Sequence, residues 1–372
     1  MQESAKESNY YRQMSDLTNY NPSQREAVTF GEGPLLVLAG PGSGKTFTIT
    51  QRILYLIHEK QIPPQKLLVI TFTREAAVSM RQRFLQISPQ HTTVNFGTFH
   101  SCFYQILLRS GRVSPGNILN EKQKKELIYP VLKKIKAHNA LSATDLPELA
   151  KNLLAAIGYY KNTGDLQSSM DRLPEEWKND FAQIYSGYEE ARKRIRGLDF
   201  DDMLKECEEL LQKDDALRAY WQNLFSYILI DEFQDINYRQ YCIVRLLAQK
   251  HKNVFAVGDD DQAIYGFRGA KPACMKQFVQ EFGAKQIILS TNYRSHQDIV
   301  EASLAVITEN SDRFPKNLEP CEANRRHLGK MDKKNYHVRI REFSGAKEQL
   351  QFLMRQLKDR TEGETYGILF RT

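Results

Sequence analysis

Cysteine is scarce in this sequence, and its few residues lie far apart. They occur in no CxxC pair and in no His/Cys cluster, the five positions being Cys102, Cys207, Cys242, Cys274 and Cys321. Disulfide frameworks and zinc sites require closely spaced sulfur ligands. The sequence therefore indicates neither kind of site and predicts reduced thiols that are mostly buried.

Long apolar runs are also lacking. The longest, such as PLLVLAG (34–40) and YILI (227–230), are far too short to span a bilayer. The polar start MQESAKESNYYRQ has no apolar segment of the kind that a secretory signal needs. With 41% hydrophobic and 26% charged residues among 372, the composition predicts a soluble cytoplasmic protein of two or three compact units, without membrane contact.

Charge of one sign does not dominate either. The formal net charge is +7, and basic residues outnumber acidic ones in 109–197 and in 325–341. Such a surplus favours a polyanionic partner such as nucleic acid, but solvated helix faces have the same composition. Charge alone therefore leaves both interpretations open.

The sequence does contain a series of short runs rich in leucine and β-branched residues. They are hydrophobic without alternation, as strands covered on both faces are, and helix-length segments separate them. The runs are PLLVLAG (34–40), KLLVITF (66–72), SYILID (226–231), NVFAVGD (253–259) and KQIILS (285–290). This pattern predicts an α/β fold with a doubly wound parallel sheet.

Two further units are expected around this sheet. Amphipathic patterns such as EKQKKELIYPVLKKI, LPELAKNLLAAIGYY and EEWKNDFAQIYSGYEEARKRI predict an inserted all-helical unit. After Ser290 a second α/β unit is expected, with helices at SHQDIVEASLAVI and AKEQLQFLMRQLKD and strands at YHVRIREF and YGILFRT. The predicted division is a sheet domain of 1–108 and 198–290, a helical insert of 109–197 and a second unit of 291–372.

The segment AGPGSGKT follows the first predicted strand and opens a helix, TFTITQRILYLI. This is the P-loop pattern, in which backbone N–H groups converge on phosphates, Lys45 reaches the β and γ phosphates and the Thr46 hydroxyl binds Mg²⁺. The alternative is a glycine-rich helix start without a ligand. The predicted phosphate-binding residues are Ala39, Gly40, Pro41, Gly42, Ser43, Gly44, Lys45 and Thr46.

Two acids end a later predicted strand, in YILIDEFQD. In the same sheet as a P-loop, Asp231 is expected to hold the Mg²⁺ shell and Glu232 to accept a proton from attacking water. Acids at the end of a strand are often a polar exit only, and phosphoryl transfer to another acceptor is a further alternative. Hydrolysis is favoured because a glutamate beside the metal-binding acid suits water.

The segment VGDDDQAIYGFRGA (257–270) joins three carboxylates to two aromatic rings and an arginine. Its polar half suits a nucleotide with a metal, and its aromatic half suits a flat apolar partner. A surface loop has no need of the rings, and a core strand has no use for the acids. The composition therefore predicts one segment with two different ligands.

Taken in order, these motifs resemble those of the UvrD/Rep/PcrA-type superfamily 1A DNA helicases. They are YNPSQREAV, AGPGSGKT, VITFTREAAVSMRQR, FGTFHS, LDFDDML, ILIDEFQDIN, VGDDDQAIYGFRGA and LSTNYRS. The resemblance covers nearly the whole chain and is sharpest in 20–108 and 197–296. It implies a RecA-like P-loop NTPase with lobes 1A and 2A clamping ATP, helical inserts 1B and 2B, and 3′-to-5′ movement along single-stranded DNA.

For the nucleotide, the resemblance implies that Gln24 reads adenine, Tyr293 stacks on the base and Arg294 reaches across the cleft as an arginine finger. A carboxamide can pair with adenine N6 and N7, which agrees with the first role. Without the resemblance, Gln24 reads as a first-turn helix residue and Arg294 as a surface cation. Phe47 stands where relatives usually carry an arginine, so a ring replaces a cation beside the base.

For DNA, the resemblance implies contacts by aromatic and polar residues of three motifs. Stacked bases contribute about 1–3 kcal/mol each without sequence preference. For Phe72 and Phe99 a place in the core is a serious alternative, and His100 reads as a hydrogen-bonding residue that positions its neighbours. The implied residues are Phe72, Thr73, Thr98, Phe99, His100, Tyr265, Phe267 and Arg268.

The resemblance also makes Gln262 the sensor of the γ-phosphate, only a few residues before Tyr265. A shift at the nucleotide end of this short segment is expected to move its aromatic end, so that ATP state changes the hold on DNA.

The later second-lobe motifs and a 2B insert are not found in the sequence. We therefore expect an amino-terminal portion of a helicase, monomeric, that binds ATP·Mg²⁺ and single-stranded DNA or DNA with a 3′ tail. Binding is expected to be weak, hydrolysis slow and unwinding absent. Alternatives are a non-motor ATP-dependent DNA-binding module and the helicase part of an AddA/RecB-like helicase-nuclease, against which the compact insert argues.

Overall fold

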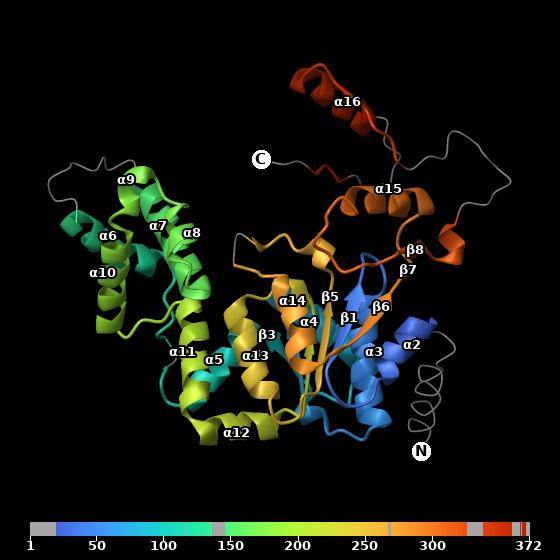
Figure 1. Ribbon diagram of the computed structural model, residues 1–372, viewed down its shortest axis with the longest axis horizontal. Helices are drawn as coiled ribbons and strands as arrows, with labels where there is room; N and C mark the ends of the chain where they lie inside the picture. Colours follow the sequence, from blue (N-terminus) through green and yellow to red (C-terminus); the bar gives the residue numbers. More distant parts are fainter. Residues whose placement is uncertain are drawn as a thin grey trace.

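The computed structural model describes residues 20–114, 116–135, 146–266, 269–325, 338–358, 365 and 367–369 (Figure 1). Phe267 and Arg268, two of the residues expected to contact DNA, lie outside this part of the chain. Within it, no helix is both long enough and apolar enough to cross a bilayer.

The centre of the molecule is a parallel sheet of six strands in the order β3-β2-β4-β5-β1-β6. The strands are β1 (Leu35–Ala39), β2 (Leu67–Thr71), β3 (Asn95–Thr98), β4 (Tyr227–Ile230), β5 (Val254–Gly258) and β6 (Lys285–Leu289). Five of them coincide with the apolar runs, so the predicted parallel sheet is confirmed. The strand that the sequence did not predict, β3, is a short edge strand without a fully buried residue.

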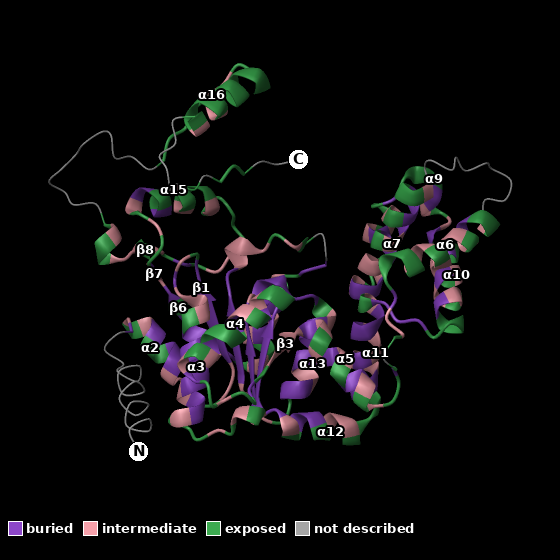
Figure 2. Cartoon of the chain, turned by 180° about the vertical axis from the view of Figure 1, so that it is seen from behind, coloured by how far each residue is buried: buried purple, intermediate pink, exposed green. Residues whose placement is uncertain are grey.

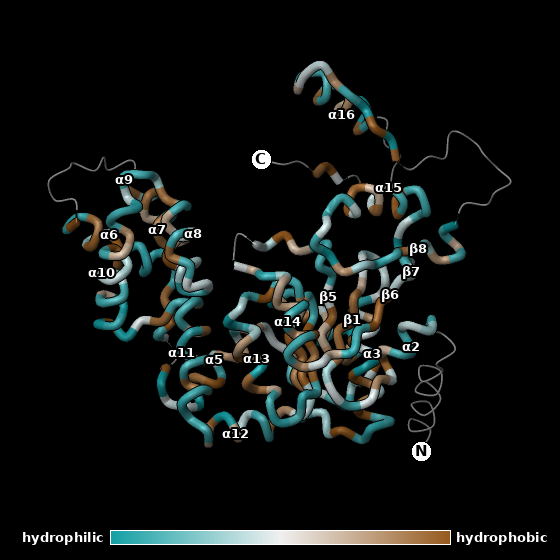
Figure 3. The backbone as a smooth tube through the Cα atoms, viewed as in Figure 1, coloured by the Kyte–Doolittle hydropathy of each residue, from teal (hydrophilic) through white to brown (hydrophobic). Residues whose placement is uncertain are grey.

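Helices cover both faces of the sheet, because alternate side chains of the four inner strands β1, β2, β4 and β5 enter opposite cores. Leu35 and Val37 of β1 pack with one cluster, and Leu36 and Leu38 with the other. Figures 2 and 3 show the buried, hydrophobic strands between helices with polar outer faces. One face is covered by α2 (Pro22–Thr29), α3 (Lys45–His58) and α4 (Arg74–Ile87), and the other by α5 (Phe99–Arg109), α11 (Phe200–Lys213), α12 (Asp215–Leu224), α13 (Tyr238–Ala248) and α14 (Ala273–Phe282).

Five helices form a separate bundle with a hydrophobic core of its own, beside the sheet (Figure 1). They are α6 (Glu121–Ile135), α7 (Leu146–Thr163), α8 (Leu166–Met170), α9 (Glu175–Lys178) and α10 (Phe181–Arg194). The chain leaves and returns at one point, where Ile118 and Leu198 form a parallel bridge. The last predicted pattern is two helices, because the chain turns at Asn179–Asp180 so that Trp177 and Phe181 both enter the core.

After β6 the chain forms little further sheet. The two predicted helices are present as α15 (Gln297–Ile307) and α16 (Ala346–Lys358), and β7 (Thr291–Asn292) pairs with β8 (Glu319–Pro320). The strand predicted at YHVRIREF is wrong for its described residues 338–343, which have no regular structure. Ile340 is 93% exposed there, and no neighbouring strand is available in the described chain to pair with it. YGILFRT lies largely outside the described residues.

Short 3-10 turns complete the described structure. They are η2 (Pro64–Lys66), η3 (Phe233–Asp235), η4 (Asp260–Gln262) and η6 (Glu322–Asn324). Two of them, η3 and η4, follow the neighbouring strands β4 and β5 at the carboxyl edge of the sheet, where ligands of doubly wound folds bind.

Candidate active site

The phosphate loop joins the end of β1 to the start of α3. Gly42 and Gly44 have φ values of 70° and 90°, which side chains other than glycine rarely adopt. The loop is closed by Ser43, whose hydroxyl donates to the carbonyl of Gly40 at 2.8 Å. Gly44 caps α3 without any side-chain hydrogen bond. The first N–H groups of α3 are thus without a side-chain cap, as an anion site requires.

Lys45 at the start of α3 pairs with Glu232, with 3.1 Å between Nζ and Oε2. Glu232 follows β4 and has the left-handed φ of 52°. Its Oε2 also accepts a hydrogen bond from Nε2 of Gln234 at 2.9 Å. Gln234 then accepts the backbone N–H of Asp259 at 2.9 Å, so this amide links the acid after β4 to the acid after β5.

Burial at this edge alters the acids around Glu232. The pKa of Asp231 rises to about 6, first because the carboxyl is buried and then because Glu232 is charged. The same two causes raise the pKa of Asp235 to about 6. One oxygen of Asp235 is buried and accepts no hydrogen bond. The site therefore holds more negative charge than Lys45 neutralises, and a cation would stabilise it.

The predicted metal ligands Thr46 and Asp231 line one pocket together. A hydroxyl and a carboxylate are hard oxygen donors, which Mg²⁺ prefers. Because the carboxyl of Asp231 is also buried and destabilised as an anion, the residues present fit a magnesium ion.

The predicted base-binding residues gather at the other end of the phosphate loop. The side chain of Gln24 donates to the carbonyl of Ser43 at 3.1 Å and accepts from the backbone of Asn21, as part of a capping box. Phe47 is exposed and packs against Tyr20, with ring centroids 5.4 Å apart. The hydroxyl of Tyr293 accepts from Asn21 at 2.9 Å, which brings all these side chains to one place.

Asn292, which the sequence did not single out, fixes Tyr293 and Arg294 against the phosphate loop. Its side chain donates to the carbonyl of Pro41 at 2.8 Å and accepts the backbone N–H of Arg294 at 2.8 Å. The N–H of Tyr293 donates to the carbonyl of Gly42 at 2.9 Å. A Cβ on Gly42 would meet Cβ of Arg294 at 2.7 Å. The approach is too close for any other residue at position 42.

The predicted DNA-facing residues Phe72, Thr73 and Tyr265 line the same pocket as the acids that follow β4. This pocket of about 440 Å³ is also lined by Thr46, Asp231, Glu232 and Gln262. Phe72 and Tyr265 stack at 5.0 Å, so each ring is partly covered by the other. Neither residue is fully buried, and Thr73 is exposed as the N-cap of α4.

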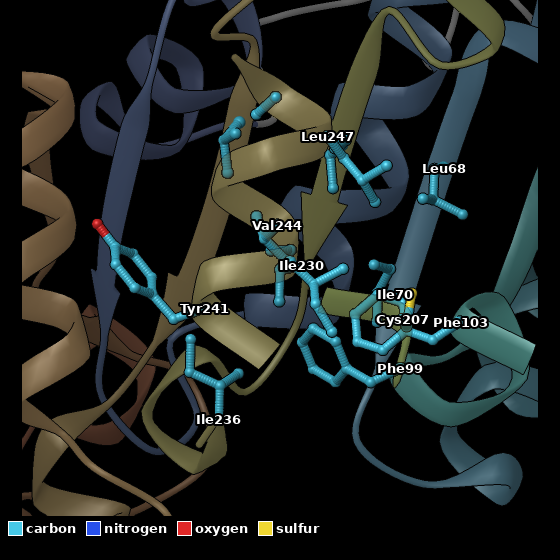
Figure 4. Packing of buried hydrophobic residues seen from close by; sticks show 14 of the residues in the cluster. Leu68, Ile70, Phe99, Phe103, Cys207, Ile230, Ile236, Tyr241, Val244 and Leu247 are labelled. Carbon is cyan, nitrogen blue, oxygen red and sulfur yellow. The ribbon is translucent and has the colours of Figure 1, made fainter. Parts of the chain in front are cut away.

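Phe99 is placed differently from the expectation. Its side chain is 2% exposed and packs in the core beside Phe103 (Figure 4). We therefore withdraw it as a base-stacking residue, because its ring does not reach the surface. Thr98 caps α5 in a capping box with Ser101, and His100 packs edge-on against Phe200 with its pKa lowered by burial. A positioning role for His100 agrees with this contact.

The three acids at 259–261 are not open to a metal nucleotide. The ammonium of Lys316 pairs with Asp259 at 2.6 Å, with Asp261 at 3.0 Å and with Asp260. Arg313 makes two further hydrogen bonds to Asp261, at 2.6 and 2.8 Å. The polar half of this segment thus binds cations of the protein itself. Gln262, the predicted phosphate sensor, donates to Asp259 at 2.5 Å.

The sequence signals for Gln234, Asn292, Arg313 and Lys316 were weak or absent. Gln234 and Asn292 lie inside the motifs ILIDEFQDIN and LSTNYRS, but a single amide in a motif does not indicate its distant hydrogen-bond partner. Arg313 and Lys316 fall in NSDRFPKNLEP, which resembles an ordinary loop. An acid cluster this dense does require cations nearby, and that requirement is the signal that could have prompted a search for them.

Comparisons with known proteins concern the family of the chain. The family model for the UvrD/REP helicase N-terminal domain matches residues 20–283. YjcD of Bacillus subtilis is 40% identical over 310 residues, which cover 80% of this chain and 40% of YjcD.

Several other relatives are named ATP-dependent DNA helicase PcrA. The protein from Staphylococcus epidermidis is 37% identical over 365 residues, covering 95% of this chain and 48% of the relative. The protein from Staphylococcus aureus is 36% identical over 363 residues, covering 96% and 48%. The chain thus spans about half the length of the curated relatives that it matches, or somewhat less. The sequence motifs, the parallel sheet and the match of the family model to residues 20–283 together show that the chain belongs to the UvrD/REP helicase family.

Proposed function

We propose that this chain acts as an ATP-dependent 3′-to-5′ motor on single-stranded DNA, or on DNA with a 3′ single-stranded tail. The observation that carries the proposal is the common pocket. Its wall joins the predicted metal ligands and hydrolytic acid to Phe72 and Tyr265, the rings expected to hold bases. The names of the PcrA relatives support both ATP and DNA as ligands.

The residues of the site divide the chemistry between them. The loop from Ala39 to Thr46 would hold the phosphates, and Mg²⁺ held by Thr46 and Asp231 would neutralise charge that develops on them. Lys45 would turn from Glu232 to the phosphates when a nucleotide binds. Oε2 of Glu232, now bonded to Lys45 at 3.1 Å, would then be free to accept a proton from water.

At the base end, Gln24, Phe47 and Tyr293 would hold adenine. Arg294 would add positive charge at the transferring phosphoryl group, since its Cβ already lies against Gly42. We propose further that the bundle of α6–α10 is the 1B insert and that the chain after β6 belongs to lobe 2A.

The test of the proposed chemistry is Glu232→Gln. We expect ATP turnover to fall about 10²–10⁴-fold, because the general base is lost, while binding of a fluorescent ATP analogue persists. Glu59→Gln, at an exposed carboxylate that ends α3, is the matched control and should leave turnover unchanged.

A second candidate function makes a different prediction in the same assay. A non-motor module would bind DNA in an ATP-dependent way without moving along it. DNA-stimulated ATP turnover that survives Glu232→Gln would favour that module over the motor.

A further inference from the structure

Residues Arg313–Leu318, here called the strap, run between the two functional halves of the site. They follow α15 and precede β8. Inward and outward residues alternate along most of it: Lys316 is buried, Leu318 is partly buried, and Pro315 and Asn317 are exposed. Along this part of the strap, alternate side chains therefore face the sheet domain.

One end of the strap touches the phosphate loop. A Cβ built on Gly40 would meet the side chain of Leu318 at 2.6 Å, so these two groups are in contact. The next residue, Glu319, donates its N–H to Ser290 at 2.8 Å, and Cys321 donates to the carbonyl of Asn292 at 2.8 Å. Since Asn292 in turn bonds Pro41, a shift of the phosphate loop has two routes into the strap.

The other end of the strap holds η4. Lys316 pairs with all three acids from 259 to 261, Arg313 pairs with Asp261, and the N–H of Phe314 donates to Asp260 at 2.7 Å. Burial alone lowers the pKa of Lys316, but the charges of Asp259 and Asp260 raise it above its usual value, so the ammonium stays charged. Phe314 also packs against the core under the sheet.

The turn held in this way leads directly to the predicted sensor and ring. Gln262 ends η4 and bonds Asp259, which Lys316 fixes from the other side. Tyr265 follows three residues later and stacks on Phe72. The contacts thus run without interruption from Gly40 through Leu318 and Lys316 to η4 and the stacked rings.

We propose that Arg313 and Lys316 are positioning residues, which transmit nucleotide-dependent movement of the phosphate loop to Gln262 and Tyr265. This inference rests on the proposed function. It differs from a rigid 257–270 segment acting alone, because the strap supplies a second connection from outside that segment. Coupling between ATP and DNA then depends on side chains that touch neither ligand.

The test measures the affinity for a fluorescent oligodeoxythymidylate with and without a non-hydrolysable ATP analogue. In the unmodified chain the two dissociation constants should differ on the order of tenfold, a usual size for such coupling. Arg313→Gln should bring the ratio to within about twofold of one and leave the affinity for the analogue unchanged. Arg313→Lys should restore part of the ratio, because it keeps one charged donor to Asp261.

Two further variants sharpen the result. Lys316→Met should also abolish the ratio, and its fold is checked by circular dichroism. If it does not fold, Arg313→Gln decides alone, since that change removes one pair rather than the buried centre. Asp312→Asn is the matched control, because Asp312 lies beside Arg313 but pairs with Lys276 on the surface. A uniform loss of DNA affinity cancels in the ratio.

The possible outcomes separate the two proposals. A normal ratio in folded Arg313→Gln overturns the positioning role. An unmodified chain that binds both ligands without coupling overturns it too, yet leaves the proposed function standing. A chain that binds neither ligand overturns the proposed function and the positioning role with it. Loss of the difference between the two DNA dissociation constants in Arg313→Gln, together with its retention in Asp312→Asn, supports both the positioning role and the proposed function.

Discussion

Two acid clusters lie side by side at the carboxyl edge of the sheet, and they are neutralised very differently. Asp231, Glu232 and Asp235 follow β4 and have one ammonium near them, that of Lys45. The acids at 259–261 follow the neighbouring β5 and are held by Lys316 and Arg313. In sequence both clusters resemble metal sites. In the first cluster the pKa values of Asp231 and Asp235 are raised to about 6, and one buried oxygen of Asp235 accepts no hydrogen bond.

The difference shows how a cation can decide what an acid cluster does. Under-neutralised acids are destabilised as anions, so they gain from a metal ion and its nucleotide. Neutralised acids gain little from a metal and instead join two parts of the chain. Hydrogen bonds and charges from Arg313 and Lys316 outweigh burial and lower the pKa of Asp261 below its usual value. Substitutions that remove a charge from one cluster or the other test this difference between the two acid clusters.

The largest effect on stability is expected from Lys316→Met. The side chain of Lys316 is 0% exposed, so its removal leaves buried carboxylates without their central cation. We expect a loss of about 3–5 kcal/mol in the free energy of unfolding. Urea unfolding followed by circular dichroism measures this loss of stability. A loss below about 1 kcal/mol would contradict the structural role of Lys316 among these acids.

A smaller effect of opposite sign is expected from Asp231→Asn. The carboxyl titrates near 6 in the folded protein and near 4 when unfolded, so the folded state binds the proton more tightly. Its contribution to stability is present below about pH 4 and is lost as the pH rises through 6. Asparagine keeps the acceptor without the charge, and the gain should be about 2 kcal/mol at pH 8.

The measurement compares urea unfolding of Asp231→Asn and of the unmodified chain at pH 8 and at pH 4. Most of the gain should vanish at pH 4, where the aspartate itself is protonated. An equal gain at both pH values would show that charge is not its cause. The same variant should lose Mg²⁺-dependent nucleotide binding, which separates stability from function.

The smallest effect on stability is expected from Lys45→Met. The side chain of Glu232 is 36% exposed, so it can be solvated when its partner is removed. We expect a change of less than about 1 kcal/mol in the free energy of unfolding, although ATP turnover should be lost. A large destabilisation, comparable with that of Lys316→Met, would remove the distinction between the clusters.

The sequence predicted those parts of the fold and site that depend on local pattern. A pattern of a few residues is enough to recognise the five apolar strands, the P-loop and the acids after β4. The placement of other residues depends on tertiary packing, which the local pattern does not contain. Phe99 adjoins a polar motif yet points into the core, and β3 is too short and exposed to give a strand signal.

Contacts between residues that lie far apart in the sequence could not be predicted either. Lys316 meets Asp259 across 57 positions of sequence, and no local pattern announces such a contact. Residues 338–343 have a strand-like composition, but a strand needs a neighbour, and the described chain supplies none. The division into lobes and the individual ligand contacts stay predictions.

The backbone of Glu232 carries a consequence of its own. Its φ of 52° lies where a side chain is strained, at a cost on the order of 1–2 kcal/mol that glycine would not bear. Glu232→Gly should therefore make the chain harder to unfold while leaving it unable to split a phosphoanhydride. At this position the backbone conformation disfavours the side chain that the proposed hydrolysis requires, so relieving the strain would remove the proposed general base.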